Sequence, residues 1–330
     1  MDWRPRHPAV HEFRTTLSRM THVSSTAPDR IISLLPSATD LLFDLGLGAR
    51  VAGVSHSCDH PGAAGLPVLT RSIVDSGASQ AEIDRAVSEA MRAGLALYSV
   101  DGGLLDAINP GLVVTQGVCE VCAVTPGTIE EAVRYLPGCL PAANVLSLEG
   151  RSVAGILDDL RALARAAGVS ELGDKLANDA QARWDAIQPV QTAPRVMTLE
   201  WVDPPFYGGH WVPEQVERAG GVNVLGAAGT DSGRTDWDAI SALDPDVIVV
   251  MCCGYGLKKN AEFARELLER TDLRAVRDGQ LWAVDANAYF SRPALGVVRG
   301  AELLAELLRG RECAGESVRL QPTPAVHTQA

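Results

Sequence analysis

The sequence contains few aromatic residues and no long apolar run. Its 330 residues include six tryptophans, five tyrosines and five phenylalanines, which make up 5% of the chain. No apolar run approaches the roughly 20 residues that a helix needs to span a bilayer. Residues 1–29 carry four arginines but lack the apolar stretch of a signal peptide. These absences predict a cytoplasmic protein that is not embedded in a membrane.

Positive charge and catalytic motifs are also scarce. The formal net charge is −12, which argues against a nucleic-acid partner because such partners are bound largely by clustered lysine and arginine. The seven cysteines do not form the dense framework of a small secreted domain, so we expect reduced thiols. The glycine-rich nucleotide loops and the Gly-x-Ser-x-Gly elbow of esterases are missing. The sequence therefore favours a binding protein over an enzyme.

A similar order of predicted strands and helices occurs in each half of the sequence, and it predicts an α/β fold with two lobes. In each half an apolar opening strand is followed by a helix that ends at Asn-Pro or Asp-Pro and then by a buried strand. The opening strands are expected at 30–35 and 195–199, and the buried strands at 112–115 and 247–250. We expect two Rossmann-like α/β lobes with a ligand cleft between them.

The predicted domain boundaries follow from these two sets of strands and helices and from a helical stretch between them. Apolar residues recur at helical spacing from 152 to 188, and Gly168 is expected to interrupt them. This stretch predicts a long backbone helix that acts as a stiff hinge. We expect a poorly ordered tail over 1–29, a first lobe over 30–150, the interlobe helix over 151–189, a second lobe over 190–312 and a disordered tail over 313–330.

An unusual concentration of aromatic residues lies just after the opening strand of the second half. Trp201, Phe206, Tyr207 and Trp211 occur among paired prolines and glycines, which forbid a continuous helix or central strand. Rings on irregular backbone suit the wall of a ligand site. The alternative is that Trp201, Trp211 and Phe290 close the core of their lobe.

The order of motifs resembles that of a known family. The first half contains Pro-Ser-Ala-Thr-Asp and then Gly-Val-Ser-His-Ser-Cys-Asp-His-Pro, and the second contains Asp-Pro-Pro-Phe, Ala-Gly-Gly-Val-Asn and Leu-Asp-Pro-Asp-Val-Ile-Val-Val. Over about residues 30–310 this order resembles the helical-backbone, class III (iron and vitamin B12 type) periplasmic substrate-binding proteins, and most of all their cobalamin-binding branch. The resemblance implies two lobes around a rigid helix, with a corrinoid, haem or iron-siderophore between them. It also implies that the protein delivers this ligand to an ABC importer.

The resemblance places the ligand site on loops at the carboxyl ends of the strands, where open α/β sheets bind ligands. The implied ligand-binding residues are Pro36, Ser37, His56, Ser57, Cys58, His60, Arg71, Cys119, Cys122, Trp201, Pro205, Phe206, Tyr207, His210, Trp211, Asn287, Tyr289, Phe290 and Arg292. A large flat macrocycle with amide arms is best held by rigid aromatic edges and a few hydrogen-bonding groups. We therefore expect cobalamin or a related corrinoid as the bound ligand.

A Cys-x-x-Cys pair follows the buried strand of the first lobe. Cys119 and Cys122 could meet Cys58 and His56 at the rim of the cleft. Three hypotheses remain open: a zinc site made by these residues, a thiol or imidazole that contacts the cobalt or the corrin face, and ordinary half-buried side chains.

The sequence departs from the periplasmic transport pattern in several ways. It shows no signal peptide or lipid-attachment cysteine, so a periplasmic location would require a misassigned start. Residues 83–100 are an insertion with the spacing of an added helix. Glu82 and Asp238 are candidate counterparts of the carboxylates that dock on an ABC permease, although acidic residues at helix starts commonly stabilise the helix dipole.

The sequence thus predicts a non-enzymatic corrinoid carrier or substrate-binding component. One alternative is an importer component for haem, an iron-siderophore or a chelated metal. Another is a thiol-dependent corrinoid-processing enzyme that uses Cys119 and Cys122.

Overall fold

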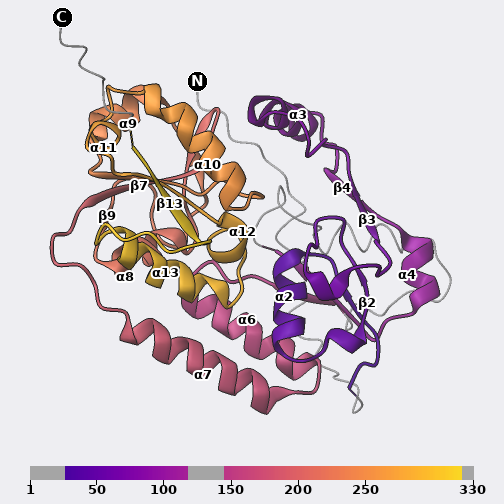
Figure 1. Cartoon of the computed structure of the whole chain (residues 1–330). Helices are drawn as coiled ribbons and strands as arrows, with labels where there is room; N and C mark the ends of the chain where they lie inside the picture. The colour runs from indigo at the N-terminus through magenta and orange to yellow at the C-terminus, as the bar shows by residue number, and fades with distance from the viewer. Residues whose placement is uncertain (1–26, 118–144, 322–330) are drawn as a thin grey trace, which may run out of the picture.

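Two α/β lobes lie side by side and are linked by a pair of helices (Figure 1). The computed structural model describes residues 27–117 and 145–321. The predicted two-lobed α/β fold class is confirmed. Within the described residues, every helix is too short or too polar to serve as a membrane span.

The first lobe is built on a parallel sheet of order β2-β1-β5-β6. Its strands are β1 (Ile31–Ser33), β2 (Val51–Val54), β5 (Leu112–Gln116) and β6 (Val145–Leu148). Side chains on both faces of β1 and β5 are buried, as expected for a parallel sheet covered on both sides. The flanking helical segments are α2 (Pro36–Asp44), η1 (Gly48–Arg50), η2 (Pro61–Ala63) and α4 (Gly102–Ile108).

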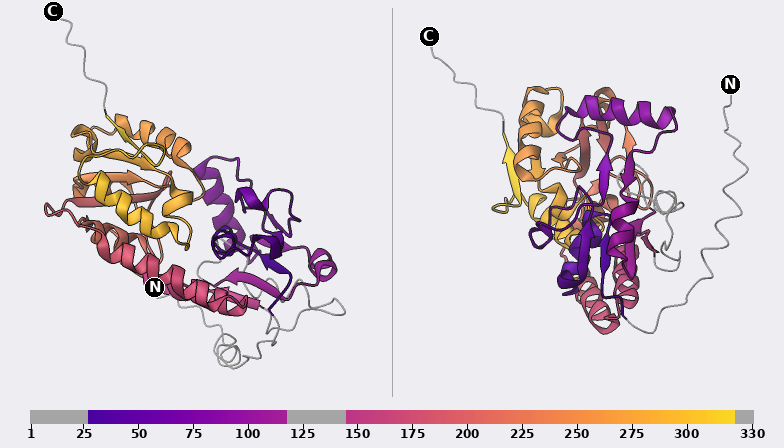
Figure 2. Two further views of the ribbon diagram at one scale, coloured as in Figure 1. Left: turned by 60° about the horizontal axis from the view of Figure 1, so that its bottom comes forward. Right: turned by 90° about the vertical axis from the view of Figure 1, so that its right-hand side faces the viewer.

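A hairpin with a helix at its tip extends from the first lobe. Strands β3 (Thr70–Ser72) and β4 (Tyr98–Val100) pair in antiparallel fashion, and α3 (Gln80–Arg92) lies between them in the chain. We call residues 70–100 the arm. The added helix predicted in the insertion is confirmed but begins earlier and ends at Arg92, because Ser79 and Glu82 form a capping box at its start. The arm carries α3 alongside the second lobe (Figures 1 and 2).

The connection between the lobes is a helical hairpin rather than one long helix. It consists of α6 (Val153–Ala166) and α7 (Ser170–Ala186), and Gly168 at φ +79° lies in the turn between them. The predicted interruption at Gly168 is therefore confirmed. Arg50 of the first lobe donates to the carbonyl of Ala167 at the end of α6, and Arg183 near the end of α7 pairs with Glu302 of the second lobe.

The second lobe contains a mixed sheet of order β10-β8-β7-β11-β12-β13, with β9 beside β7. Its strands are β7 (Arg195–Val202), β8 (Pro205–Tyr207), β9 (Val222–Asn223), β10 (Gly233–Arg234), β11 (Val247–Val250), β12 (Leu281–Val284) and β13 (Ser317–Leu320). Its helical segments are α8 (Val212–Ala219), α9 (Trp237–Leu243), α10 (Leu257–Glu266), η4 (Leu267–Glu269), α11 (Arg274–Arg277), α12 (Ala286–Tyr289) and α13 (Gly296–Leu307). Strands β7, β11 and β12 are parallel, so their carboxyl ends share one edge.

The predicted end of the second lobe at residue 312 is wrong. Strand β13 pairs with β12 in antiparallel register from Leu281↔Leu320 to Val284↔Ser317, and Leu320 is buried. The polar composition after residue 312 concealed this strand, which covers the otherwise open edge of β12.

A single apolar core passes from one lobe to the other through the helical hairpin. The same cluster of buried side chains contains Ile31 of the first lobe, Leu163 of α6 and Trp282 of the second lobe. Continuous packing of this kind makes the connection stiff.

Candidate functional site

The loops that follow the strands of the two sheets face each other. Arg292, which follows α12, reaches across to the first lobe and donates to Asp59 at 2.7 Å and to Asp40 at 3.3 Å. Asp59 follows β2, and Asp40 lies on α2, which follows β1. The carboxyl edges of the two sheets are therefore adjacent, as the sequence predicts.

Arg292, for which ligand binding stays a prediction, pairs with two carboxylates of the first lobe in the structure. Its side chain is 16% exposed and is occupied by the two carboxylates. Burial raises the pKa of Asp40, and the Arg292 charge opposes that shift. Arg292 thus links the lobes in this arrangement.

Three predicted aromatic residues lie on the β7–β8 hairpin. Trp201 is opposite Phe206, and Tyr207 is opposite Leu199, with the turn at Asp203-Pro204. All three rings are partly exposed. The adjoining Pro205 is buried opposite Val202.

A fourth ring, which the sequence reasoning missed, extends this aromatic group. Tyr255 follows β11 and lies with its ring centroid 5.9 Å from that of Trp201. Its position after a buried parallel strand was the available signal, because such loops face the ligand edge. We call Trp201, Phe206, Tyr207 and Tyr255 the aromatic surface. Trp201 and Tyr255 are in ring contact, whereas Phe206 and Tyr207 are consecutive in β8 and point to opposite faces of the strand, and Arg234 lies over the Phe206 ring at 5.5 Å.

Trp211 and Phe290 are not part of this surface. They are 5% and 2% exposed, and the indole Nε1 of Trp211 donates to the carbonyl oxygen of Phe290 at 2.8 Å. The structure places both in the core of the second lobe, which was the alternative reading of these rings. Their loop position did not reveal which way the side chains point.

The predicted residues of the first lobe have partners of their own. The Cys58 sulfur lies 3.1 Å from Thr39 Oγ1 and 3.2 Å from Ser55 Oγ. His56 Nδ1 lies 2.7 Å from Thr70 Oγ1, and burial lowers the pKa of this imidazole. Ser57 is exposed beside them. These contacts hold the loop against β3.

His60 and the start of α2 also serve the local structure. The His60 ring stacks on Phe43 at 3.9 Å, and its Nδ1 accepts from the amide of Gly62 at 3.0 Å. Pro36 is at the start of α2, and Ser37 is buried in its first turn. None of these contacts directs a side chain to a metal.

The predicted metal site has no support among residues 27–117 and 145–321. No group of three metal-binding side chains occurs there, and Cys58 and His56 bond to different hydroxyl groups. Cys119 and Cys122 lie outside the described residues. Hypotheses that depend on them stay predictions.

His210 lies at the junction of the second lobe with α6. It adopts φ +52°, and its Nε2 is 3.4 Å from Asp231, which also accepts from Arg151 at 2.5 Å. Burial lowers the pKa of His210, and the nearby Arg151 adds to the effect. These two effects favour the neutral imidazole, and the Asp231 carboxylate opposes them.

The remaining predicted residues are dispersed. The Tyr289 hydroxyl donates to Glu316 at 2.9 Å, and burial raises its pKa to about 12. The backbone N–H of Asn287 donates to the backbone carbonyl oxygen of Tyr255 at 3.4 Å. Arg71 is exposed on β3, opposite Ser99. Of these three residues, Asn287 lies next to Tyr255 of the aromatic surface, and its role, like those of Tyr289 and Arg71, stays a prediction.

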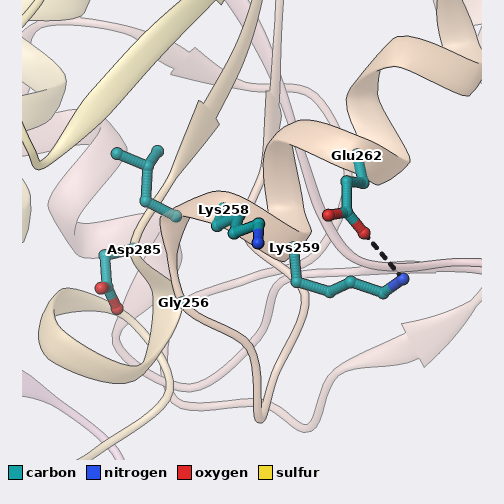
Figure 3. Close-up of a pocket in the computed structure, with 6 residues that line it drawn as sticks. Gly256, Lys258, Lys259, Glu262 and Asp285 are labelled. Atoms are coloured by element: carbon teal, nitrogen blue, oxygen red, sulfur yellow. Dashed lines mark hydrogen bonds and ion pairs between the residues drawn. The ribbon is translucent and has the colours of Figure 1, made fainter.

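An open pocket lies at the carboxyl ends of β11 and β12. Its volume is about 580 Å³, and its lining is Gly256, Leu257, Lys258, Lys259, Glu262 and Asp285. Lys259 pairs with Glu262 at 3.0 Å, while Asp285 lies on the opposite side of Gly256 (Figure 3). Because Tyr255 precedes Gly256, this polar pocket adjoins the aromatic surface.

Known proteins share this fold. The sequence profile of the periplasmic binding protein family matches residues 141–288. The resemblance to this family is confirmed. The family consists of binding proteins rather than enzymes.

Two relatives illustrate the match. A vitamin B12-binding protein of Vibrio cholerae serotype O1 is 21% identical over 286 residues, which cover 85% of this chain and 89% of the relative. The crystal structure of a periplasmic haem-binding protein of Vibrio cholerae superposes with a TM-score of 0.62 at 17% identity, over 84% of this chain and 98% of that protein.

The crystal structure of a periplasmic vitamin B12-binding protein of Vibrio cholerae gives a TM-score of 0.59 at 20% identity, over 86% and 97% of the two chains. At such identities the superpositions establish the fold alone. Because these relatives are periplasmic, they give the predicted cytoplasmic location no support, and the periplasmic alternative fits them.

Proposed function

We propose that this protein binds a corrinoid, cobalamin or a close relative, between its two lobes and acts as a carrier or substrate-binding component. The observation that carries the proposal is the aromatic surface at the edge where the two sheets meet. Trp201, Phe206 and Tyr207 are partly exposed on a short hairpin, and Tyr255 adds a ring from the adjacent loop. Rigid rings of this kind suit a flat macrocycle.

The chemistry of the surrounding residues supports a ligand that is apolar on its faces and polar at its rim. The aromatic surface adjoins the pocket lined by Lys258 and Asp285. Each aromatic ring buried by the ligand would contribute about 1.5–3 kcal/mol. The similarity to a vitamin B12-binding protein over 85% of the chain agrees with this ligand class.

Haem is the second candidate ligand, and His210 is the observation that favours it. A neutral imidazole is the form that ligates iron, and burial lowers the pKa of His210, which favours this form. A haem-binding protein is also among the similar structures. The Nε2 atom of His210, however, lies 3.4 Å from Asp231. Haem ligation by His210 would therefore require the imidazole to move away from that carboxylate.

A direct comparison of the two ligands tests the proposal. Purified protein is mixed with hydroxocobalamin or with haemin, passed through a gel-filtration column and examined by visible spectroscopy. We expect hydroxocobalamin to co-elute with the protein and its visible bands to shift. Co-elution of haemin alone would reject the corrinoid proposal in favour of haem, and co-elution of neither would reject both.

The location and the permease partner are part of the proposal. We infer that the protein delivers its ligand to an importer if it is found outside the cytoplasmic membrane, and that it acts as an internal carrier otherwise. Fractionation of the native cells, with antibody detection of the protein, distinguishes these two roles.

A further inference from the structure

The arm of the first lobe inserts a side-chain amide into the second lobe. Gln80 is the first residue of α3 and is 5% exposed. Its Oε1 accepts hydrogen bonds from the backbone amides of Val202 at 2.9 Å and Asp203 at 3.0 Å. The Trp201 indole donates to the backbone carbonyl of Gln80 at 3.3 Å. The amide is thus anchored at the tip of the aromatic hairpin.

This amide occupies the edge of the sheet where open α/β folds bind ligands. Val202 ends β7, and Cys252 follows the neighbouring strand β11. The side chain of Gln80 also interacts with the buried Cys252 thiol. The amide therefore lies beside the carboxyl ends of β7 and β11, next to Trp201 of the aromatic surface.

Only the oxygen of the Gln80 carboxamide is well hydrogen-bonded in this position. Its Nε2 is buried and has no hydrogen-bond partner of normal geometry among the described residues, and a thiol is only a weak acceptor. A buried donor without a good acceptor lowers stability. The position therefore recognises the amide oxygen well and leaves its nitrogen poorly bonded.

Among the described residues, an ion pair also joins helix α3 of the arm to strand β10 of the second lobe. Arg234 of β10 donates to Asp84 of α3, and the arginine side chain is about half exposed. An exposed ion pair of this kind adds little stability. Gln80 is thus better buried than the ion pair between Arg234 and Asp84.

We propose that the backbone amides of Val202 and Asp203 form a carboxamide subsite, which Gln80 fills in the unliganded protein and from which a primary amide of the ligand displaces it. The inference rests on the proposed corrinoid function, because the side chain of Gln80 is itself a propionamide and a corrinoid carries amide arms. Displacement frees the arm from the hairpin and opens access to the aromatic surface. Gln80 then acts as an internal competitor of the ligand.

The affinity of a Gln80→Ala variant tests this role. Removing the competitor raises the fraction of protein that is ready to bind, so we expect hydroxocobalamin to bind about tenfold more tightly, mostly through a faster association rate. Haemin should change less, because its propionate groups would bring a negative charge into this buried position. Met91→Ala, an exposed position on the same helix, is the control. Unchanged or weaker hydroxocobalamin binding by Gln80→Ala would show that Gln80 merely supports the hairpin.

A second measurement does not depend on a corrinoid. In Gln80→Ala the subsite is empty, and acetamide has the size of the missing group. Millimolar acetamide should raise the melting temperature of this variant and alter its tryptophan fluorescence, while N,N-dimethylacetamide and the wild-type protein should show no such effect. If acetamide changes neither the melting temperature nor the fluorescence of Gln80→Ala, the proposed carboxamide subsite is wrong. Rescue without corrinoid binding by the wild-type protein would retain the subsite and reject the proposed ligand.

If Gln80→Ala does not fold, Asp84→Ala replaces it in the binding test. This variant removes the ion pair with Arg234 and leaves Gln80 in place. We expect faster association of hydroxocobalamin with no loss of affinity. An association rate equal to that of the wild-type protein would contradict the opening of the arm.

Discussion

Arg292 of the second lobe donates a hydrogen bond to Asp59 of the first lobe over 2.7 Å. The same guanidinium pairs with Asp40, a carboxylate whose pKa is raised by burial. The contact holds together two loops that would otherwise be free to separate around a ligand. The lobes are therefore linked by charge at Arg292 and at the Arg234–Asp84 pair, and by the amide of Gln80.

Loss of this link should lower stability. Arg292→Met removes the charge and keeps much of the side-chain volume, which leaves Asp40 without its cation. We expect the free energy of unfolding to fall by about 1–3 kcal/mol in urea denaturation. Lys175→Met, which removes an exposed pair with Asp179, should change it by less than about 1 kcal/mol. Equal effects of the two variants would contradict the linking role of Arg292.

Asp159 should give stability a measurable pH dependence. Burial raises its pKa, although Gly150 donates a backbone hydrogen bond to its carboxylate at 2.7 Å. A raised folded-state pKa contributes stability below the ordinary value of 3.8, and this contribution is lost as the pH rises through the shifted value. Asp159→Asn keeps an acceptor for Gly150 and should therefore melt at a higher temperature than the wild-type protein at pH 7.

The difference between Asp159→Asn and the wild-type protein should disappear near pH 4. Asp158→Asn is the control, since this neighbouring side chain is 77% exposed. Thermal melts at several pH values measure both variants. A stabilisation by Asp159→Asn that does not vary with pH would rule out burial of the charge as its cause.

The close contact between α6 and α7 depends on Gly173. A Cβ atom at this position would lie 2.2 Å from the Cβ of Ala164. Gly173→Ala should therefore force the helices apart and lower the free energy of unfolding by about 1–3 kcal/mol. Gly103→Ala in α4 meets no atom closer than 3.5 Å, so its effect should be neutral or stabilising by up to about 1 kcal/mol. Denaturant titration of both variants checks this contrast.

Trp201 and Trp211 of the second lobe should respond differently to truncation. Trp211 is buried in the core and bonded to Phe290 O, so Trp211→Ala should lower the free energy of unfolding by about 3–5 kcal/mol. Trp201 is partly exposed, and Trp201→Ala should lower it by less. A larger loss for Trp201→Ala would mean that its ring, rather than that of Trp211, supports the core.

Much of the fold could be predicted from the sequence because apolar strands and helix breaks are local signals. The runs at 112–115 and 247–250 lie within β5 and β11, and Gly168 marks the turn between α6 and α7. Strand β13 was missed because it has little apolar character and gains its place by pairing with β12.

The candidate site was less predictable because it depends on side-chain direction and on contacts between distant segments. Nothing near Trp211 in the sequence indicated that its indole would bond to Phe290 O across the lobe. Gln80 and Val202 are likewise far apart in the chain, and only the path of the arm brings them together. The expectation that Trp201, Phe206 and Tyr207 lie on irregular backbone is wrong, because they lie in strands β7 and β8, which pair around the turn at Asp203-Pro204. The position of Trp201 was still informative because its strand ends at the ligand edge of the sheet.

The dissociation constant of hydroxocobalamin for Trp201→Ala tests the role of the aromatic surface most directly. Titration followed by visible spectroscopy gives this constant for the wild-type protein, for Trp201→Ala and for Trp237→Ala, whose ring stacks with Arg270 instead. We predict that Trp201→Ala weakens binding about tenfold to a hundredfold, while Trp237→Ala binds as the wild-type protein does. Equal binding by all three proteins, or binding by none, would contradict the proposal that the aromatic surface holds a corrinoid.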